Sequence, residues 1–192
     1  TDVIDLWQFH EIIYDNDPDW VFEKGAMKAA IEARKEGKVR YIGFTGHKDP
    51  RIHLRMLDKP FDWDTVQMPI NLLDAHYDSF QNKVVPVCRE KKIGVIGMKA
   101  LAGGKIPSEL DIPAPTCRRL SLSLPISTLV CGIKSRADLQ QEVKMARSFQ
   151  PVSADEITQL MAQTKGPGSD GKMEPWKTTD YGSGYHRKQH DD

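Results

Sequence analysis

The sequence predicts an α/β fold built from parallel β/α repeats, and three observations support this prediction. Short apolar runs alternate along the chain with longer amphipathic runs. The apolar runs begin roughly 25 to 35 residues apart, which is the length of one β/α unit. They also lack a polar–apolar alternation, as is typical of parallel strands that are covered by helices on both faces.

Five of the apolar runs have the length and composition of buried strands. The first begins almost at once, after Thr1 and Asp2, and leads directly into a histidine, His10. The others are each followed by a turn or by polar residues. The five predicted strands are residues 3–9, 39–44, 65–68, 94–98 and 127–131.

The segment between the first two strands carries clear helix signals. Asp17 supplies an N-cap, Pro18 suits the first helical position, and Gly37 is a typical helix end. The sequence therefore predicts one continuous helix between these residues. One face of that helix is expected to contain Phe22, Ala26, Ala29, Ala30 and Ala33.

Later helices are predicted from capping patterns. Residues 80–92 read as a helix that Pro86 must either kink or delay. Ser135 and Asp138 form a capping-box pattern, and apolar residues follow at helical spacing. Those apolar residues are Leu139, Val143 and Ala146.

A second capping box, Ser153 with Glu156, starts the last predicted helix, which is expected to end near Thr164. The residues after it are rich in Gly, Pro, Asp and Lys and have no apolar period. We therefore divide the chain into a body, residues 1–164, and a C-terminal tail, residues 165–192, expected to lie on the surface.

Five β/α units fit two architectures. One is an open five-stranded sheet, and the other is part of a (β/α)8 barrel, which needs eight units and about 250 residues. Three further units of about 30 residues would bring this chain of 192 residues to about 280. Composition and periodicity leave both architectures open.

Composition excludes several classes of partner. Lys plus Arg and Asp plus Glu both number 27, so the chain lacks the positive charge of a nucleic-acid binder. No apolar run reaches the roughly 18 residues of a membrane span, so no membrane association is expected. The three cysteines, Cys88, Cys117 and Cys131, lie in apolar stretches and are interpreted as reduced core residues of a cytoplasmic protein.

In either architecture, functional residues collect at the C-terminal ends of parallel strands. The side chains at these positions are mostly polar, but they include no paired carboxylates, which argues against glycoside hydrolysis. The histidines show no metal-ligand spacing, so no metal site is expected. The residues that follow the strands are His10, Glu11, Thr45, Gly46, His47, Lys48, Gln67, Asn71, Met98, the 99–104 stretch, Gly132, Ile133, Lys134 and Ser135.

Each of these positions also has a purely structural interpretation. Gly132, Lys134 and Ser135 precede a helix and could bind a phosphate group, or Ser135 could only cap the helix. Gly103 and Gly104 could admit a ligand close to the backbone or simply form a turn. Thr45–Gly46 and Gln67 could be an ordinary turn and a core amide, and His10 a surface residue.

Taken together, five stretches resemble the aldo/keto reductases. They are TDVIDLWQFH, GKVRYIGFTGH, TVQMPINLLD, GVIGMKALAGGKI and LSLPISTLVCGIKSRADLQQ, in that order. KMEPWKTTDYGSG also resembles the C-terminal segment of one subgroup. The resemblance starts at the family's fourth barrel strand and implies a partial (β/α)8 barrel with about five of its eight units.

The resemblance implies a site for NADP(H) along the strand ends. His10 would orient a small carbonyl substrate, and Thr45, Gly46 and Gln67 would hold the nicotinamide carboxamide. Met98 stands where many members have a tyrosine that stacks on the nicotinamide. The pyrophosphate would lie along 99–104, with Lys99, Leu101, Gly103 and Gly104 as the expected contacts.

The adenosine end would be bound near the last strand. Gly132, Lys134 and Ser135 would take the 2′-phosphate. Gln141 and Glu142 stand where the family often has a Glu–Asn pair near the adenine. This departure leaves the preference for NADP over NAD open.

The implied activity is reduction of an aldehyde or ketone by NADPH. In the family, the catalytic tyrosine, lysine and aspartate lie in the three units that would precede Thr1. We therefore expect this chain alone to turn over carbonyls poorly. The alternatives are a non-catalytic NADP(H)-binding or regulatory module and a fragment without function.

Two further expectations concern surfaces. Five strands of an open barrel leave two sheet edges unpaired, so self-association through these edges is expected. The tail aromatics Trp176, Tyr181 and Tyr185 could line a pocket or pack on the outer helices, and we favour packing.

Overall fold

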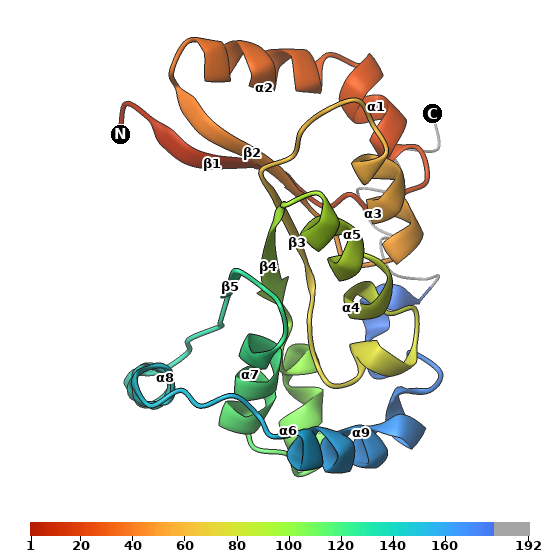
Figure 1. The fold of residues 1–192 in the computed structure, drawn as a ribbon, viewed down its shortest axis with the longest axis vertical. Coiled ribbons are helices and arrows are strands. Elements are labelled where there is room, and N and C mark those ends of the chain that lie inside the picture. Colours follow the sequence, from red (N-terminus) through yellow and green to blue (C-terminus); the bar gives the residue numbers. More distant parts are fainter. Residues whose placement is uncertain (179–192) are drawn as a thin grey trace.

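The computed structural model describes residues 1–178 and contains one five-stranded sheet (Figure 1). All pairings are parallel, and the strand order follows the sequence from β1 to β5. Doubly wound sheets instead reverse their order at a switch point. The sequential order is that of a barrel wall and favours the partial barrel over a doubly wound sheet. The strands are β1 (Ile4–Phe9), β2 (Val39–Thr45), β3 (Thr65–Pro69), β4 (Gly94–Met98) and β5 (Thr128–Leu129).

The predicted strands agree with the structure except at the last one. β5 has only two residues, whereas residues 127–131 were predicted. Backbone bonds from Ser127 N–H to Val95 O and from Val130 N–H to Gly97 O flank it, at 2.8 and 2.9 Å. β5 is an edge strand of the described sheet and pairs with β4 alone.

The single helix predicted between Asp17 and Gly37 is wrong, because two helices occupy this segment. They are α1 (Asp17–Glu23) and α2 (Ala26–Lys35). Gly25 between them has φ of 91°, a left-handed conformation that glycine adopts without steric cost and that interrupts a helix. Gly37 does end the second helix, again with positive φ.

This break also changes which residues face the core. Met27 and Ala30 are buried in α2, whereas Ala26 and Ala29, predicted on the same face, are exposed. The predicted apolar face assumed one continuous helix, but residues on either side of Gly25 belong to two helices whose buried faces need not align. The predicted face therefore survives only in Ala30 and the partly buried Phe22 and Ala33.

The next helices follow β2 and β3. They are α3 (Pro50–Leu57), the 3-10 turn η1 (Asp74–His76), α4 (Phe80–Lys83) and α5 (Val85–Glu90). The predicted effect of Pro86 is confirmed, because the helix is divided at Val84 and Pro86 stands in the first turn of α5. Three elements after β4 were not predicted: η2 (Ala102–Gly104), α6 (Lys105–Glu109) and α7 (Ala114–Ser123).

Both predicted capping boxes are present. Ser135 caps α8 (Arg136–Arg147) with Asp138, and Ser153 caps α9 (Ala154–Gly168) with Glu156. α9 continues four residues past its predicted end at Thr164. The buried Thr164 side chain bonds to His76 at 2.9 Å, and Gly168 packs against the His76 ring, so contacts with η1 hold the last turn.

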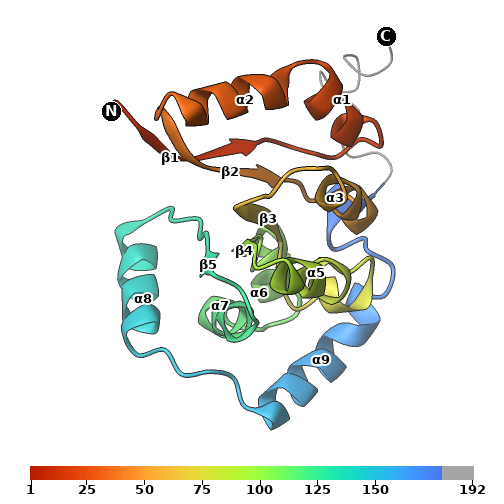
Figure 2. The same ribbon diagram turned by 45° about the horizontal axis from the view of Figure 1, so that its top comes forward.

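The predicted apolar face of α8 is exposed. Leu139 and Val143 are 50% and 40% exposed, and Ala146 is exposed as well. Figure 2 shows α8 at a distance from α9, connected by an extended segment. α8 instead packs against α7 through Glu142, which forms a buried ion pair with Arg118.

The core consists of two apolar clusters. The first lies under β1–β4 and includes Phe44, Met56 and Phe80, which are fully buried. The second joins the loops after β3 and β4 to α6 and α7 and includes Trp176 of the tail. All three cysteines are free thiols, with Cys131 only partly buried. Among residues 1–178, no helix has the length and apolarity needed to span a membrane.

The tail is anchored at η3 (Pro175–Lys177) by a buried ionic cluster. The Lys177 ammonium lies 2.8 Å from Asp74 and 2.7 Å from Glu174, and all three side chains are essentially inaccessible. Trp176 packs beside α6 and α7, as predicted for packing on outer helices. Tyr181 and Tyr185 lie outside the described residues.

Candidate functional site

The C-terminal ends of β1 and β2 bring His10 and Thr45 together. Phe9 pairs with Phe44, so the two residues that follow lie side by side. His10 Nδ1 is 3.3 Å from Thr45 Oγ1, and the backbone N–H of Glu11 donates to the same oxygen, also at 3.3 Å. His10 is exposed at this edge of the sheet, while Thr45 is buried.

The next strand ends continue the same row. Thr45 pairs with Gln67, and the Gly46 N–H donates to the Gln67 carbonyl at 3.2 Å. The Gln67 amide nitrogen lies 3.5 Å from the Met98 sulfur. The structure thus brings together all four residues predicted near the nicotinamide. Met98 is half-buried and presents an apolar surface there.

Two buried histidines lie behind this row and were not among the predicted site residues. His47 Nε2 lies 3.3 Å from a Glu11 carboxylate oxygen, and burial, with Lys99 nearby, lowers the pKa of His47. His53 is fully buried against Phe44 and Phe80, and burial lowers its pKa to about 4. The signal for His47 was its position directly after a predicted strand.

A cavity of about 270 Å³ lies between the loops that follow β4 and β5. Its lining comes from segments about thirty residues apart in the sequence. Six predicted coenzyme contacts line it: Lys99, Leu101, Gly103, Gly104, Gly132 and Lys134. Arg118 also lines it and was missed, because α7 gave no clear helix signal in the proline-flanked stretch PAPTCRRLSLSLP.

The cavity is lined by three cationic side chains, of which Arg118 is already paired with Glu142 behind the wall. Lys99, Arg118 and Lys134 line it, and no carboxylate does. Burial lowers the pKa of Lys99, and Glu11 opposes that effect. The Lys99 ammonium lies 4.6 Å from the centre of the Trp176 ring, so this residue of the tail makes a cation–π contact with the lysine.

The glycines that line the cavity leave their backbone accessible, and two of them have positive φ. Gly103 and Gly104 have φ of 69° and 100°, which other residues rarely adopt. A Cβ at Gly103, Gly104 or Gly132 would meet no protein atom within 4 Å. The absent side chains therefore leave the backbone open to close approach by a ligand, which fits a pyrophosphate group.

The N-terminus of α8 is partly satisfied from within the chain. The N–H groups of Lys134 and Ser135 donate to the Asp138 carboxylate at 3.0 and 2.9 Å, and Ser135 Oγ accepts from the Asp138 N–H. These contacts lower the pKa of Asp138. Ser135 therefore acts as a cap, and the Lys134 side chain is the exposed cationic group at this end.

The two residues predicted near the adenine have different surroundings. Gln141 is exposed on α8. Glu142 is buried, and its carboxylate pairs with the guanidinium of Arg118. This ion pair links α8 to the cavity wall, because Glu142 belongs to α8 and Arg118 of α7 lines the cavity.

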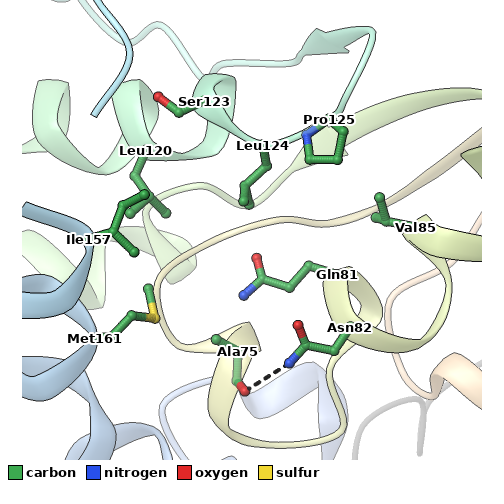
Figure 3. A pocket seen from close by; sticks show the side chains of 10 residues that line it. All are labelled: Ala75, Gln81, Asn82, Val85, Leu120, Ser123, Leu124, Pro125, Ile157 and Met161. Atoms are coloured by element: carbon green, nitrogen blue, oxygen red, sulfur yellow. Dashed lines mark hydrogen bonds between the residues drawn. The ribbon is translucent and has the colours of Figure 1, made fainter. Parts of the chain in front are cut away.

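A second cavity, of about 200 Å³, lies on the outer side between α4, α5, α7 and α9 (Figure 3). Leu120, Leu124 and Met161 supply apolar walls, and the Gln81 amide points into the space. It shares no lining residue with the strand-end site. Among the described residues, no group of three or more His, Cys, Asp or Glu side chains could hold a metal ion.

Comparison with known proteins gives one family. The model of the aldo/keto reductase family matches residues 1–154. The chain is 31% identical over 110 residues to the uncharacterized oxidoreductase YcsN of Bacillus subtilis (strain 168), which covers 57% of this chain and 34% of that protein.

Solved structures agree on the fold. Aldo-keto reductase AKR11C1 from Bacillus halodurans matches in its apo form with a TM-score of 0.63 and 20% identity, over 85% of this chain and 62% of that one. Its holo form matches with a TM-score of 0.64 and 18% identity, over 85% and 59%. The chain therefore spans about a third of its curated relative and about three fifths of these structures.

Proposed function

This chain belongs to the aldo/keto reductase family, and from that premise we propose that it forms the coenzyme-binding part of an NADP(H)-dependent carbonyl reductase. The substrate is an aldehyde or a ketone. One observation carries the proposal: six predicted coenzyme contacts line a single cavity in which three side chains are cationic.

The charge of the cavity supports a phosphorylated ligand. The chain as a whole has no net charge, and because Arg118 is already paired with Glu142, the uncompensated cations that line the cavity are Lys99 and Lys134. Lys99 stands at the more buried end and Lys134 at the exposed end. Phosphate groups accept charge-assisted hydrogen bonds from such side chains, and we assign the pyrophosphate to Lys99 and the 2′-phosphate to Lys134.

The strand ends supply the reacting part of the proposed site. The coenzyme, when bound, supplies the hydride. Gln67 and Thr45 hold its carboxamide, and Met98 gives an apolar surface where an aromatic ring is common. His10 donates a hydrogen bond to the carbonyl oxygen and so stabilises the charge that develops there.

The proton donor of this reaction is assigned by family resemblance to a tyrosine with a lysine and an aspartate, on units that precede the strand ending in His10. Positioned acid catalysis contributes about 10²–10⁴ in rate. We therefore expect the 192-residue chain alone to bind NADPH but to oxidise it slowly at most.

The binding part of the proposal is tested by titrating the chain with NADPH and with NADH and following nicotinamide fluorescence. We expect Lys134→Ala to weaken NADPH binding by about tenfold, because one charge-assisted bond is lost, and to affect NADH less. Lys144→Ala, an exposed lysine on α8, is the matched control. Equal loss for both coenzymes would contradict the assignment of Lys134.

Adding an aldehyde to the same titration separates the alternatives. Binding with steady NADPH oxidation at a normal reductase rate contradicts our expectation that this chain alone lacks an effective proton donor. Binding without oxidation fits the proposal and also a non-catalytic module, and adding the preceding units separates these two. No binding of either coenzyme indicates a fragment without function.

We further propose self-association through the sheet edges and a cytoplasmic location. β1 and β5 pair on one side only within residues 1–178, and Ile4 on β1 and Tyr41 on the neighbouring β2 are about half exposed. Free thiols favour a reducing compartment. A monomer in sedimentation equilibrium at high concentration would contradict the association.

A further inference from the structure

We propose that Thr45 is a positioning residue that fixes the tautomer of His10, so that Nε2 carries the ring hydrogen. The location of that hydrogen follows from the contacts of one hydroxyl group. Only its use, as a donor to a carbonyl oxygen, rests on the reductase function proposed above.

The Thr45 hydroxyl lies between two groups at the end of β1. His10 Nδ1 and the Glu11 backbone nitrogen each lie 3.3 Å from Thr45 Oγ1. Thr45 is only 7% exposed, so water has little access to its hydroxyl. The hydrogen bonds of this group are therefore set by the protein.

The number of donors and acceptors then determines the tautomer. A hydroxyl offers one hydrogen and two lone pairs. The Glu11 N–H can only donate, so it uses one lone pair. The hydrogen of a buried hydroxyl needs an acceptor, and within residues 1–178 the other hydrogen-bond neighbour of Thr45 Oγ1 is His10 Nδ1. Nδ1 accepts, and the neutral ring carries its hydrogen on Nε2.

The surrounding backbone holds this arrangement in place. Glu11 has φ of 54°, which turns its N–H toward Thr45. Its side chain contacts buried His47 at 3.3 Å, and the Ile12 N–H donates to the Thr45 carbonyl at 2.8 Å. The loop after β1 is thus attached to Thr45 at two backbone groups and to His47 at a third point.

This tautomer has two chemical consequences. The exposed Nε2–H can donate to a carbonyl oxygen, whereas the other tautomer would present a lone pair that repels it. Thr45 has already used its hydrogen, so one lone pair remains. Toward the nicotinamide carboxamide it can only accept, which directs the amide NH2 group, rather than the carbonyl, to Thr45.

The test is nuclear magnetic resonance of the 192-residue chain labelled with nitrogen-15 in histidine, recorded without coenzyme or substrate at about pH 8, where imidazole is mostly neutral. Two-bond proton–nitrogen correlations identify the tautomer, and His10→Gln assigns the signals. We expect His10 to hold its hydrogen on Nε2 in the unmodified chain and in Thr45→Ser. Thr45→Val should shift both ring nitrogens toward the tautomer mixture of an unrestrained imidazole.

Two results would overturn the proposal: a hydrogen on His10 Nδ1 in the unmodified chain, or a Thr45→Val spectrum identical to it. The buried His53 signals report whether each variant is folded, and Thr45→Ala replaces Thr45→Val if they are lost. Because neither coenzyme nor substrate is present, failure of NADPH binding leaves this result unchanged. The two proposals therefore fail separately.

Discussion

Two regions of the molecule are held together very differently. The packed region comprises β1–β4 with α1–α5, where Phe44, Met56 and Phe80 are completely buried. The loose region comprises β5, residues 130–135 and α8, where Leu139 and Val143 are largely exposed. Figures 1 and 2 both show α8 at the margin of the molecule, away from the helices that cover β1–β4.

The difference divides the proposed coenzyme site. His10, Thr45 and Gln67 stand on the packed region, so the nicotinamide end is preorganised. Gly132 and Lys134 stand on the loose region, so we expect the adenosine end to gain more order than the nicotinamide end when a ligand binds. Ordering costs binding free energy, and we expect most of that cost to arise at α8.

The largest expected effect comes from comparing a buried residue of the packed region with an exposed apolar residue of the loose region. Phe44→Ala should lower the free energy of unfolding by about 3–5 kcal/mol, because it removes a buried ring that contacts Trp63 and His53. Val143→Ala on α8 should change it by less than about 0.5 kcal/mol. Urea unfolding measures both. Equal effects would remove the distinction between the regions.

Acid should destabilise the packed region through His53. Its pKa is about 4 in the folded chain, against 6.5 for the ordinary group, so the unfolded chain binds the proton first as the pH falls. Stability should therefore decrease from pH 6.5 to pH 4, by up to about 3 kcal/mol for this residue.

Urea unfolding as a function of pH measures this loss. His53→Gln should make the decrease shallower rather than abolish it, because burial also lowers the pKa of His47 and His76. An unchanged slope in that variant would show that His53 does not titrate as described.

The two capping boxes give a smaller and sharper comparison. Ser135→Ala and Ser153→Ala each remove a cap of about 1 kcal/mol. We expect the loss at Ser153 to lower global stability, since α9 packs on η1. The loss at Ser135 should appear only as roughly fivefold faster amide exchange in α8, because α8 opens locally. A global effect of Ser135→Ala would place α8 in the packed region.

The smallest expected effect is a difference in thiol reactivity between the two regions. Burial raises the pKa of Cys88 to about 12 and that of Cys117 to about 11, so neither should react with a disulfide reagent in the native state. Cys131 beside β5 is partly exposed and should react. We expect one modified thiol per chain, and none after Cys131→Ser.

The sequence predicted the sheet well, since each strand is a local apolar run bounded by recognisable turns. It failed where tertiary contacts decide. Gly25 was predicted inside a helix because an isolated glycine gives no sign of its φ. Arg118 was missed because α7 lies among prolines, and its place in the cavity depends on the β4–β5 connection. The roles of the predicted coenzyme residues stay predictions until binding is measured.

The anchor formed by Asp74, Glu174 and Lys177 has a consequence for synthesis of the chain. Asp74 and Lys177 are 103 residues apart in the sequence, yet they form a buried ion pair in which Glu174 also takes part. While the ribosome is still making the last part of the chain, Asp74 has its hydrogen bonds from Ser79, Phe80 and Gln81 but not its ammonium partner. We therefore expect this loop to mature after translation reaches the tail, and to be the part that chaperones protect until then.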